Sequence, residues 1–537
     1  MTWLAETAML SHGWRRFLLL LVAGALAATS IAPWFILPAI FVTFPIWVWC
    51  LDGAEHRRGV QRLFGPAFTI GFAFGLGYFT VSFHWLADAF FVDGGMILVL
   101  MPFAIVALAA LIALFWGLAS ALAHLFWSNG AWRVVTLATF LTIAEWARGH
   151  VLSGFPFDLL GYALTPTDEM LQLASVTGIY GLTFLAALLA LTPALIWPAD
   201  QRNLTRRLFP FFLSLAVLAG QLGYGHTRLV GTTVTPRTDV KMRLVQPLIY
   251  EHADWGKVDP VAIVDKLLTL SEMQTSPTDK GLAGVTQVVW PESSLPFFLP
   301  QYPEALARIA RMLPDKVVLL AGAPRQDYEP NGAVTTHAPY NSLLAINSDG
   351  EIFDSYDKSH LVPFGEFLPF QEFFSKLGIK QFVPGADGWA HGDARRRLMS
   401  LPDTPPFLAL ICYEILFSGD LGETEQAQFL LNITNDAWFD DSIGPAQHAQ
   451  HAKVRAVEEG MSLIRAANSG ITMLVDPLGR VTAQLAPKEM NVLDVVPDQK
   501  LPRTLFAQYR YWPLLIALLI GLLVSVAVTR GGKRRRR

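Results

Sequence analysis

Long apolar stretches separated by short charged segments make up the first half of the chain. No charged residue occurs between positions 17 and 51, a stretch too long for one membrane span of about 20 residues. Pro33 and Pro38 interrupt it near the middle, so we expect a hairpin of two helices there. The other apolar stretches cover residues 65–86, 95–127, 134–150, 170–197, 208–224 and 512–529. The pattern therefore predicts a multispan α-helical membrane domain of about eight transmembrane helices.

The hydrophobic pattern changes between residues 240 and 495. Short β-branched apolar runs alternate there with amphipathic segments, which is typical of an α/β domain. The expected strands cover residues 240–246, 286–292, 316–324, 340–347, 407–414, 429–434 and 471–477, and the expected helices cover 261–272, 303–312 and 447–460. We therefore predict a transmembrane domain over residues 1–228, an α/β domain over 229–505, and a C-terminal transmembrane helix with a basic tail over 506–537.

Composition and charge also favour a membrane protein. Of 537 residues, 53% are hydrophobic and 16% are charged, whereas a soluble protein usually carries about 25% charged residues. If the N-terminus is cytoplasmic, one group of basic residues falls entirely on the cytoplasmic side, which satisfies the positive-inside rule. The group contains Arg15, Arg16, Arg57, Arg58, Arg62, Arg133, Arg202, Arg206, Arg207 and the terminal KRRRR. The α/β domain is then extracytoplasmic. The basic tail is expected to anchor this topology at anionic lipid, and with a net charge of −3 we expect no nucleic-acid partner.

Two charged residues occur inside one of the predicted spans. Glu145 and Arg148 are costly at membrane depth unless they are paired or face a cavity, which makes them functional candidates. Because they are three residues apart on an expected helix, they can also pair with each other.

Cys50 and Cys412 are the chain's two cysteines, and we expect no structural disulfide between them. Cys412 occurs in the apolar run "LALICYEILF" (408–417), where a free cysteine often only packs as a small hydrophobe. A reactive role requires partners. Glu292 follows the apolar strand "VVW", and a carboxylate in that position needs water or a cation. Lys358 lies in a loop over residues 355–369 that is rich in proline, glycine and aromatics. Each of these residues alone also has an ordinary structural explanation.

Glu292, Lys358 and Cys412, in this order at strand ends, resemble the nitrilase superfamily and its αββα sandwich. The membrane spans before and after this domain make the chain similar to the apolipoprotein N-acyltransferase family in particular. The resemblance covers nearly the whole chain and includes "EWARG" (145–149), "GFPF" (154–157), "LVQPLIYEHADW" (244–255), "WPESSLP" (290–296), "YDKSHLVPFGEFLPF" (356–370), "ICYE" (411–414) and "LNITNDAWF" (431–439).

The resemblance implies an acyl transfer with an acylated enzyme between two half-reactions. Cys412 would be the nucleophile, because a thiolate attacks esters well and its thioester can then be attacked by an amine. Glu292 would be the general base. Lys358 would stabilise the oxyanion, together with the backbone N–H of Tyr413. The resemblance also implies supporting roles for Glu366, Tyr413 and Glu414, and substrate contacts for Trp255, Asn341 and Trp438.

Some of these residues have a second explanation. Glu366 can hold Lys358 by a charge-assisted hydrogen bond. Trp255 and the aromatics of residues 294–302, which we expect to be exposed, can instead rest at the lipid interface. His448 and His451 are three apart on an expected helix, as two metal ligands can be. No glutamate accompanies them in a zinc-protease pattern, so we expect a structural role.

The family resemblance implies a bacterial inner-membrane protein with cytoplasmic termini and a periplasmic catalytic domain. Its expected partners are a phospholipid acyl donor, a diacylglyceryl apolipoprotein acceptor and the bilayer, with no cofactor or metal, and we expect a monomer. One alternative is a membrane-anchored amidase of the same superfamily, which would share the three residues but would not need many spans. A transporter is the other alternative, and it predicts more polar residues inside the membrane and no loss of function in Cys412→Ser.

Overall fold

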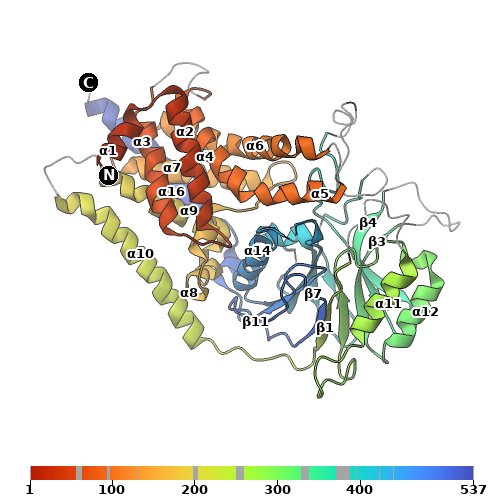
Figure 1. Ribbon diagram of the computed structural model, residues 1–537. Coiled ribbons are helices and arrows are strands. Elements are labelled where there is room, and N and C mark those ends of the chain that lie inside the picture. The colour runs from red at the N-terminus through yellow and green to blue at the C-terminus, as the bar shows by residue number, and fades with distance from the viewer. Residues whose placement is uncertain are drawn as a thin grey trace. The chain divides into compact units, whose positions relative to one another are not determined.

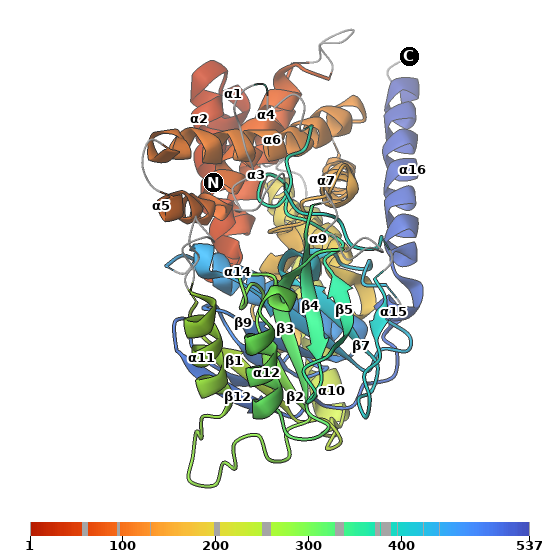
Figure 2. The same cartoon turned by 90° about the vertical axis from the view of Figure 1, so that its right-hand side faces the viewer.

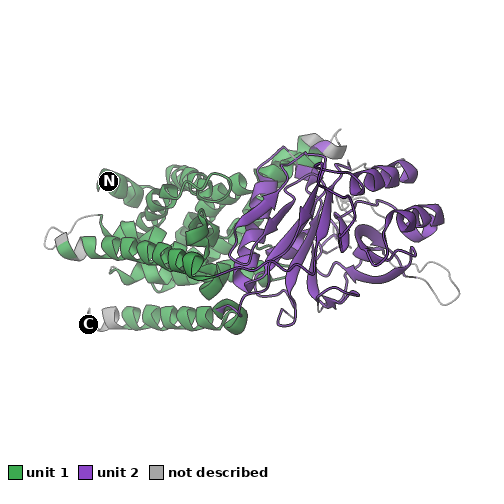
Figure 3. Ribbon diagram, turned by 90° about the horizontal axis from the view of Figure 1, so that it is seen from below, with its two compact units in different colours: residues 1–90, 94–232, 505–537 green, residues 91–93, 233–504 purple. Residues whose placement is uncertain are grey.

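The computed structural model describes residues 2–55, 63–93, 97–128, 130–197, 204–249, 259–327, 338–370, 376, 388–394, 396–422, 424–439 and 441–535. The chain forms two units, which Figure 3 shows in green and purple. Unit 1 contains residues 1–90, 94–232 and 505–537, and unit 2 contains residues 91–93 and 233–504.

Apolar helices form unit 1, and several of them begin where proline occurs in the sequence. Pro38 and Pro66 occupy the first turns of α3 and α4, where the missing N–H of proline has no intrahelical partner to lose. The helices up to residue 231 and after residue 504 are α1 (Thr2–Leu10), α2 (Gly13–Ala27), α3 (Pro38–Asp52), α4 (Pro66–Ser82), α5 (Ala89–Asp93), α6 (Ile97–Leu125), α7 (Trp132–His150), α8 (Asp168–Leu171), α9 (Ala174–Leu191), α10 (Leu204–Gly231), α15 (Leu505–Tyr509) and α16 (Trp512–Arg535). Short 3-10 helices are η1 (Ala28–Ser30), η3 (His84–Asp88), η4 (Leu160–Leu164) and η5 (Thr192–Leu195).

The number of helices able to cross a membrane differs from the predicted eight. Within the described residues, four helices are long and apolar enough, and a fifth span results if α4 and η3, bent by 53°, count as one. The predicted hairpin over residues 17–51 forms α2 and α3, each of 15 residues and therefore shorter than a typical span. α7 has 19 residues but contains Glu145 and Arg148. The four unbroken spans are Val99–Leu125, Ala174–Leu195, Leu208–Gly231 and Trp512–Arg530.

Glu145 and Arg148 pair with each other on α7. The Arg148 Nε and Nη2 atoms each lie 2.9 Å from a carboxylate oxygen of Glu145, and both side chains are fully buried. Trp116 of α6 donates to Glu145 Oε1 at 2.8 Å. Arg148 Nη1 donates to the carbonyl oxygens of Phe155 and Phe157. The ion pair therefore holds the segment after α7 against the helices.

Unit 2 consists of two six-stranded sheets. The strand orders are β12-β1-β2-β3-β4-β5 and β11-β10-β9-β8-β7-β6. The strands are β1 (Met242–Gln246), β2 (Gln287–Trp290), β3 (Val318–Arg325), β4 (Tyr340–Ile346), β5 (Ile352–Asp357), β6 (Leu398–Met399), β7 (Phe407–Ile411), β8 (Phe429–Thr434), β9 (Ser462–Ala467), β10 (Met473–Val475), β11 (Val481–Gln484) and β12 (Asn491–Val495). In each sheet the three central strands, β1 to β3 and β7 to β9, run parallel.

Helices cover the outer faces of the sheets. α11 (Pro260–Ser271) and α12 (Pro303–Met312) lie side by side in front of the first sheet in Figure 2. α14 (Gly444–Glu459) lies on the opposite side, beyond the second sheet, in Figure 1. Short 3-10 helices are η7 (Leu299–Gln301), η8 (Cys412–Leu416) and η9 (Ala437–Phe439). The layers are those of the predicted αββα sandwich.

Successive residues of the central strands supply two different cores. Val289 and Leu320 point between the sheets and pack with Ile411 and other side chains of the second sheet. Val288 and Leu319, one residue earlier, pack instead under α11 and α12. A strand buried on both faces needs apolar residues at every position, which explains the continuous hydrophobic runs in the sequence.

All seven predicted strands and three predicted helices occur, with ends that shift by a few residues. The largest shifts are of three residues: β7 was predicted to reach residue 414 and ends at Ile411, and α14 was predicted to begin at residue 447 and begins at Gly444. The sequence analysis did not identify β5, β6, β9, β11 or β12.

Candidate active site

Cys412 occupies a sharp turn between a strand and a short helix. β7 ends at Ile411, and η8 begins at Cys412 with a φ of +52°. A residue with a Cβ in this left-handed conformation is strained by about 1–3 kcal/mol, a feature that is typical of functional sites. The thiol forms no disulfide and the residue is partly exposed. Cys412 is thus packed against the core but not sealed within it.

Glu292 and Lys358 lie together although they follow different strands of the first sheet. Glu292 comes two residues after the end of β2, and Lys358 comes directly after β5. Both are buried, and Lys358 Nζ donates to Glu292 Oε1 at 3.1 Å. The other carboxylate oxygen of Glu292 accepts the backbone N–H of Asn435 at 2.8 Å. Because Asn435 follows β8, Glu292 joins the ends of the two sheets.

Glu366 and Asn341 complete the cluster around Lys358. Lys358 Nζ donates to Glu366 Oε1 at 2.7 Å, and Glu366 Oε2 accepts the N–H of Val362 at 2.8 Å. The Asn341 amide donates both to Glu292 Oε1, at 2.8 Å, and to Glu366 Oε1, at 3.1 Å. Asn341 thus contacts the two carboxylates that also bind the ammonium of Lys358.

The charges of this cluster fix the protonation of its members. Burial lowers the pKa of Lys358, but the neighbouring Glu292 and Glu366 outweigh burial and raise it well above its usual value. Burial and then the charge of Glu292 raise the pKa of the Cys412 thiol, and Lys358 opposes them only in part. At neutral pH the site therefore holds an ammonium ion and a protonated thiol, so the nucleophile requires a base.

Glu414 connects the cysteine turn to the lysine loop. Its Oε2 accepts the N–H of Ile411 at 2.8 Å, and its Oε1 accepts the hydroxyl of Ser359 at 2.7 Å. The hydroxyl of Tyr356 donates to both oxygens. Burial raises the pKa of Glu414, but Arg396 and the donors of Ile411 and Ser359 outweigh burial. The pKa of Glu414 therefore lies below its usual value. The ionised carboxylate therefore holds β7 and the segment after β5 at a fixed distance.

Tyr413 and Trp438 are the remaining predicted site residues that the structure describes. Tyr413 is buried and its ring packs on Phe417 at 5.2 Å. Trp438 lies in η9 and is partly exposed. Trp255 lies outside the described residues. Of the aromatics in residues 294–302, Phe297 is buried, Phe298 is partly exposed and Tyr302 is exposed, so the expectation of exposure is wrong for Phe297. Phe297 packs in the core under α12, together with Leu295 and Leu299.

His448 and His451 contact different groups. His448 contacts Cys412 and Asp436, whereas His451 contacts the carbonyl oxygen of Gln447 on its own helix. Among the described residues, no group of three or more His, Cys, Asp or Glu side chains is arranged to hold a metal ion. Asn435, Asp436 and Arg465 were not singled out from the sequence. The sequence signal for Asn435 and Asp436 was their presence in the run "LNITNDAWF", whereas Arg465 lies in β9, which was not predicted.

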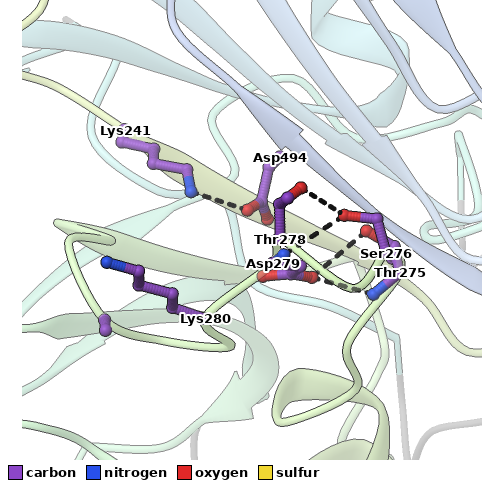
Figure 4. A pocket seen from close by; sticks show the side chains of 8 residues that line it. Lys241, Thr275, Ser276, Thr278, Asp279, Lys280 and Asp494 are labelled. Carbon is purple, nitrogen blue, oxygen red and sulfur yellow. Dashed lines mark hydrogen bonds and ion pairs between the residues drawn. The ribbon is translucent and has the colours of Figure 1, made fainter.

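A polar pocket of about 310 Å³ lies elsewhere in unit 2 (Figure 4). Three of its charged groups already have partners, since Lys241 pairs with Asp494 at 2.8 Å and Asp279 pairs with Arg243 at 2.9 Å. None of the predicted site residues lines it. The lining residues are Lys241, Thr275, Ser276, Thr278, Asp279, Lys280, Ala283 and Asp494.

The two-sheet fold, with a cysteine after β7 and a carboxylate–ammonium pair after β2 and β5, defines a domain of the carbon–nitrogen hydrolase class. The family model described as carbon–nitrogen hydrolase matches residues 254–501. The model described as the apolipoprotein N-acyltransferase N-terminal domain matches residues 23–192. Together, the two matches cover part of each unit.

Curated relatives match the whole chain. An apolipoprotein N-acyltransferase of Rhodopseudomonas palustris is 40% identical over 98% of this chain and 97% of its own length. That of Bradyrhizobium diazoefficiens is 39% identical over 99% of this chain and 98% of its own. The chain belongs to the apolipoprotein N-acyltransferase family. A solved amidase from Nesterenkonia sp. is 16% identical and has a TM-score of 0.34, covering 53% of this chain and 98% of that chain, and the assignment does not depend on it.

Proposed function

We propose that this protein transfers a fatty acyl chain from a phospholipid to the α-amino group of the diacylglyceryl-cysteine at the N-terminus of bacterial apolipoproteins. The contact that carries the proposal is the buried Lys358–Glu292 pair, at 3.1 Å, whose charges both act on the partly exposed Cys412. Family membership over the full chain supports the choice of substrates.

In the first half-reaction, the Cys412 thiol attacks the ester carbonyl of the phospholipid. Glu292 accepts the thiol proton as the carbon–sulfur bond forms. Negative charge develops on the carbonyl oxygen, and Lys358 and the backbone N–H of Tyr413 stabilise it. The ester carbon–oxygen bond then breaks, and the lysophospholipid leaves with the proton that Glu292 held. The product is a thioester on Cys412.

In the second half-reaction, the amine of the acceptor attacks the thioester. Glu292 takes a proton from the attacking amine, and the same donors stabilise the oxyanion. The carbon–sulfur bond breaks, an amide forms, and the thiolate recovers the proton from Glu292. The kinetics are ping-pong, because the first product leaves before the second substrate reacts.

Three donors hold the Glu292 carboxylate in the place that both steps require. Asn341 and Lys358 contact Oε1, and the N–H of Asn435 contacts Oε2. Glu366 keeps Lys358 next to Glu292 through its own 2.7 Å contact with the ammonium. Asn341 therefore acts on the carboxylates, while Trp255 and Trp438 bind the substrates.

The catalytic domain comprises residues 229–505 and is periplasmic, with both chain termini in the cytoplasm and the monomeric protein in the inner membrane. The arginines beside the apolar helices support this orientation. An eight-span arrangement uses α2, α3 and α7 in addition to the five apolar spans. α2 continues directly into η1, which extends it to Ser30.

Label transfer distinguishes this function from amide hydrolysis. Purified protein in vesicles that contain acyl-labelled phosphatidylethanolamine is expected to become labelled, and a diacylglyceryl peptide with a free N-terminus then removes the label as an amide. A protein that hydrolyses small amides and takes no label from the lipid is instead an amidase. Transport that persists in Cys412→Ser would support the transporter alternative.

A further inference from the structure

His448 contacts the backbone of the cysteine rather than its sulfur. It lies on α14, and its Nε2 atom is 3.2 Å from the carbonyl oxygen of Cys412. A general base in a cysteine enzyme contacts the nucleophilic atom itself. The imidazole is therefore in position to hold the turn, and no proton of the reaction passes through it.

Buried polar groups align His448 from the other side. Asp436 Oδ1 lies 3.0 Å from His448 Nδ1, and Arg465 Nη2 donates to Asp436 Oδ2 at 2.8 Å. Thr434 donates its hydroxyl to Asp436 Oδ1 at 3.1 Å. Burial raises the pKa of Asp436, but Arg465 and then His448 lower it below its usual value, so the carboxylate stays ionised. Burial and then Arg465 lower the pKa of His448, and Arg465 Nη2 lies 3.1 Å from His448 Nδ1. In the neutral imidazole, Nδ1 therefore accepts from Arg465, and the Nε2–H donates to the carbonyl of Cys412.

Side chains hold the backbone on both sides of Cys412, at the N–H of the preceding residue and at the carbonyl of Cys412 itself. Glu414 accepts the N–H of Ile411 at 2.8 Å, and His448 binds the carbonyl of Cys412. Between them, Cys412 has the strained φ of +52°. Because φ and ψ of Cys412 fix the direction of its Cα–Cβ bond, contacts that hold the backbone before and after it restrict where the sulfur lies. Glu414 is already among the expected site residues, and its contact is one residue before Cys412, whereas His448 holds the peptide group that directly follows the Cys412 Cα.

We propose that His448, aligned by Asp436 and Arg465, is a positioning residue of the acyl transfer that directs the Cys412 thiol toward the Glu292–Lys358 pair. The proposal rests on the proposed function of Cys412. Misplacement of a reacting atom by about 1 Å lowers rates by about 100-fold, so loss of this contact slows the acylation of Cys412 without weakening lipid binding.

Two substitutions separate the two contacts of the imidazole. The amide nitrogen of His448→Gln reaches the position of Nε2 and can still donate to Cys412. The amide of His448→Asn reaches only the position of Nδ1, near Asp436. The full-length protein in micelles, in a Cys50→Ala background, is mixed with acyl-labelled phosphatidylethanolamine, and the labelling of Cys412 is followed in a single turnover. The amplitude reports the folded fraction, and the rate constant reports the position of the thiol.

We expect acylation by His448→Gln within about 5-fold of the parent rate, and acylation by His448→Asn about 30- to 100-fold slower, at an unchanged half-saturating lipid concentration. His451→Gln and His451→Asn are the matched controls, because His451 is buried on the same helix and its Nδ1 contacts the carbonyl oxygen of Gln447. Both controls are expected to remain within about 3-fold of the parent. If His448→Asn does not fold, His448→Met, which has the length of glutamine but no donor, takes its place.

Equal rates in His448→Gln and His448→Asn, whether fast or slow, would overturn the positioning role. A change confined to the half-saturating lipid concentration would do the same. These results leave the labelling of Cys412 in the parent protein intact. Absence of label in the parent itself overturns the proposed function and this inference together.

Discussion

Asn341 and Lys358 donate to the same two carboxylate oxygens. Asn341 Nδ2 lies 2.8 Å from Glu292 Oε1 and 3.1 Å from Glu366 Oε1, and Lys358 Nζ lies 3.1 and 2.7 Å from the same atoms. The backbone N–H of Lys358 also donates to the carbonyl of Asn341 at 2.8 Å. Two negative charges are thus buried around one ammonium and one amide. The geometry of the base depends on both donors.

Glu366→Gln removes one of the two charges that hold the ammonium. The side chain keeps its shape, but Lys358 loses the charge-assisted contact and its pKa falls toward its usual value. We expect both half-reactions to slow by about 10- to 100-fold, measured separately by labelling and by chase with the acceptor peptide. Ser294→Ala, which changes a buried hydroxyl bonded to the carbonyl of Gly322, is a control for general loss of packing. Parent-like rates in Glu366→Gln would show that Glu292 alone positions Lys358.

Asn341→Leu tests whether Asn341 positions the carboxylates or binds substrate. Without its amide, two buried carboxylate oxygens each lose a donor, which lowers the free energy of unfolding by about 1–3 kcal/mol. We expect a lower rate constant for acylation at an unchanged half-saturating lipid concentration, together with a lower melting temperature. A rise in the half-saturating concentration alone would instead assign Asn341 to substrate binding.

The pH dependence of alkylation tests the protonation of the nucleophile. Burial and Glu292 raise the pKa of the Cys412 thiol above its usual value of 9.0, so the thiolate fraction is small at neutral pH and grows about tenfold for each pH unit. In Cys50→Ala, iodoacetamide should modify Cys412 at a rate that rises without a plateau between about pH 6 and 9. Lys358→Met removes the opposing charge and should slow the reaction further. A plateau near pH 7 would mean that the resting enzyme holds a thiolate.

The charged pair of unit 1 can be tested by a double-mutant cycle. Removing one partner leaves the other buried and uncompensated, which costs about 3–5 kcal/mol. We therefore expect Glu145→Gln and Arg148→Gln each to lower the melting temperature of the protein in detergent, and Glu145→Gln/Arg148→Gln to lower it by less than the sum. Additive effects would mean that the two side chains do not depend on each other.

The pattern of hydrophobic residues predicted the layers of unit 2 because its strands are buried on both faces. Val288, Val289 and Trp290 form an uninterrupted apolar run, and each of them enters a core. β9 was missed because the buried Arg465 interrupts its run, and its charge is compensated by Asp436 from another strand end. Such compensation depends on tertiary contacts, which local sequence does not encode.

The candidate site could be predicted only in part, because some of its contacts also depend on tertiary structure. Glu292, Lys358, Glu366 and Cys412 were identified through the order of the motifs, whereas the role of His448 depends on the place where α14 meets the turn after β7. The prediction of eight spans counted every apolar stretch, because hydropathy does not distinguish residues that face lipid from residues that face protein. Ile40, Phe44 and Trp47 of α3, for example, are buried within unit 1. Within the described residues, length and composition alone support four or five spans.

Intact-protein mass spectrometry tests the central claim most directly. The purified protein, incubated with a phospholipid of defined chain length and without acceptor, is expected to gain the mass of one acyl group on Cys412. Hydroxylamine should remove this mass, and Cys412→Ser should not form a hydroxylamine-sensitive adduct. A folded protein that transfers acyl groups to the acceptor peptide without ever carrying one on Cys412 would contradict the account.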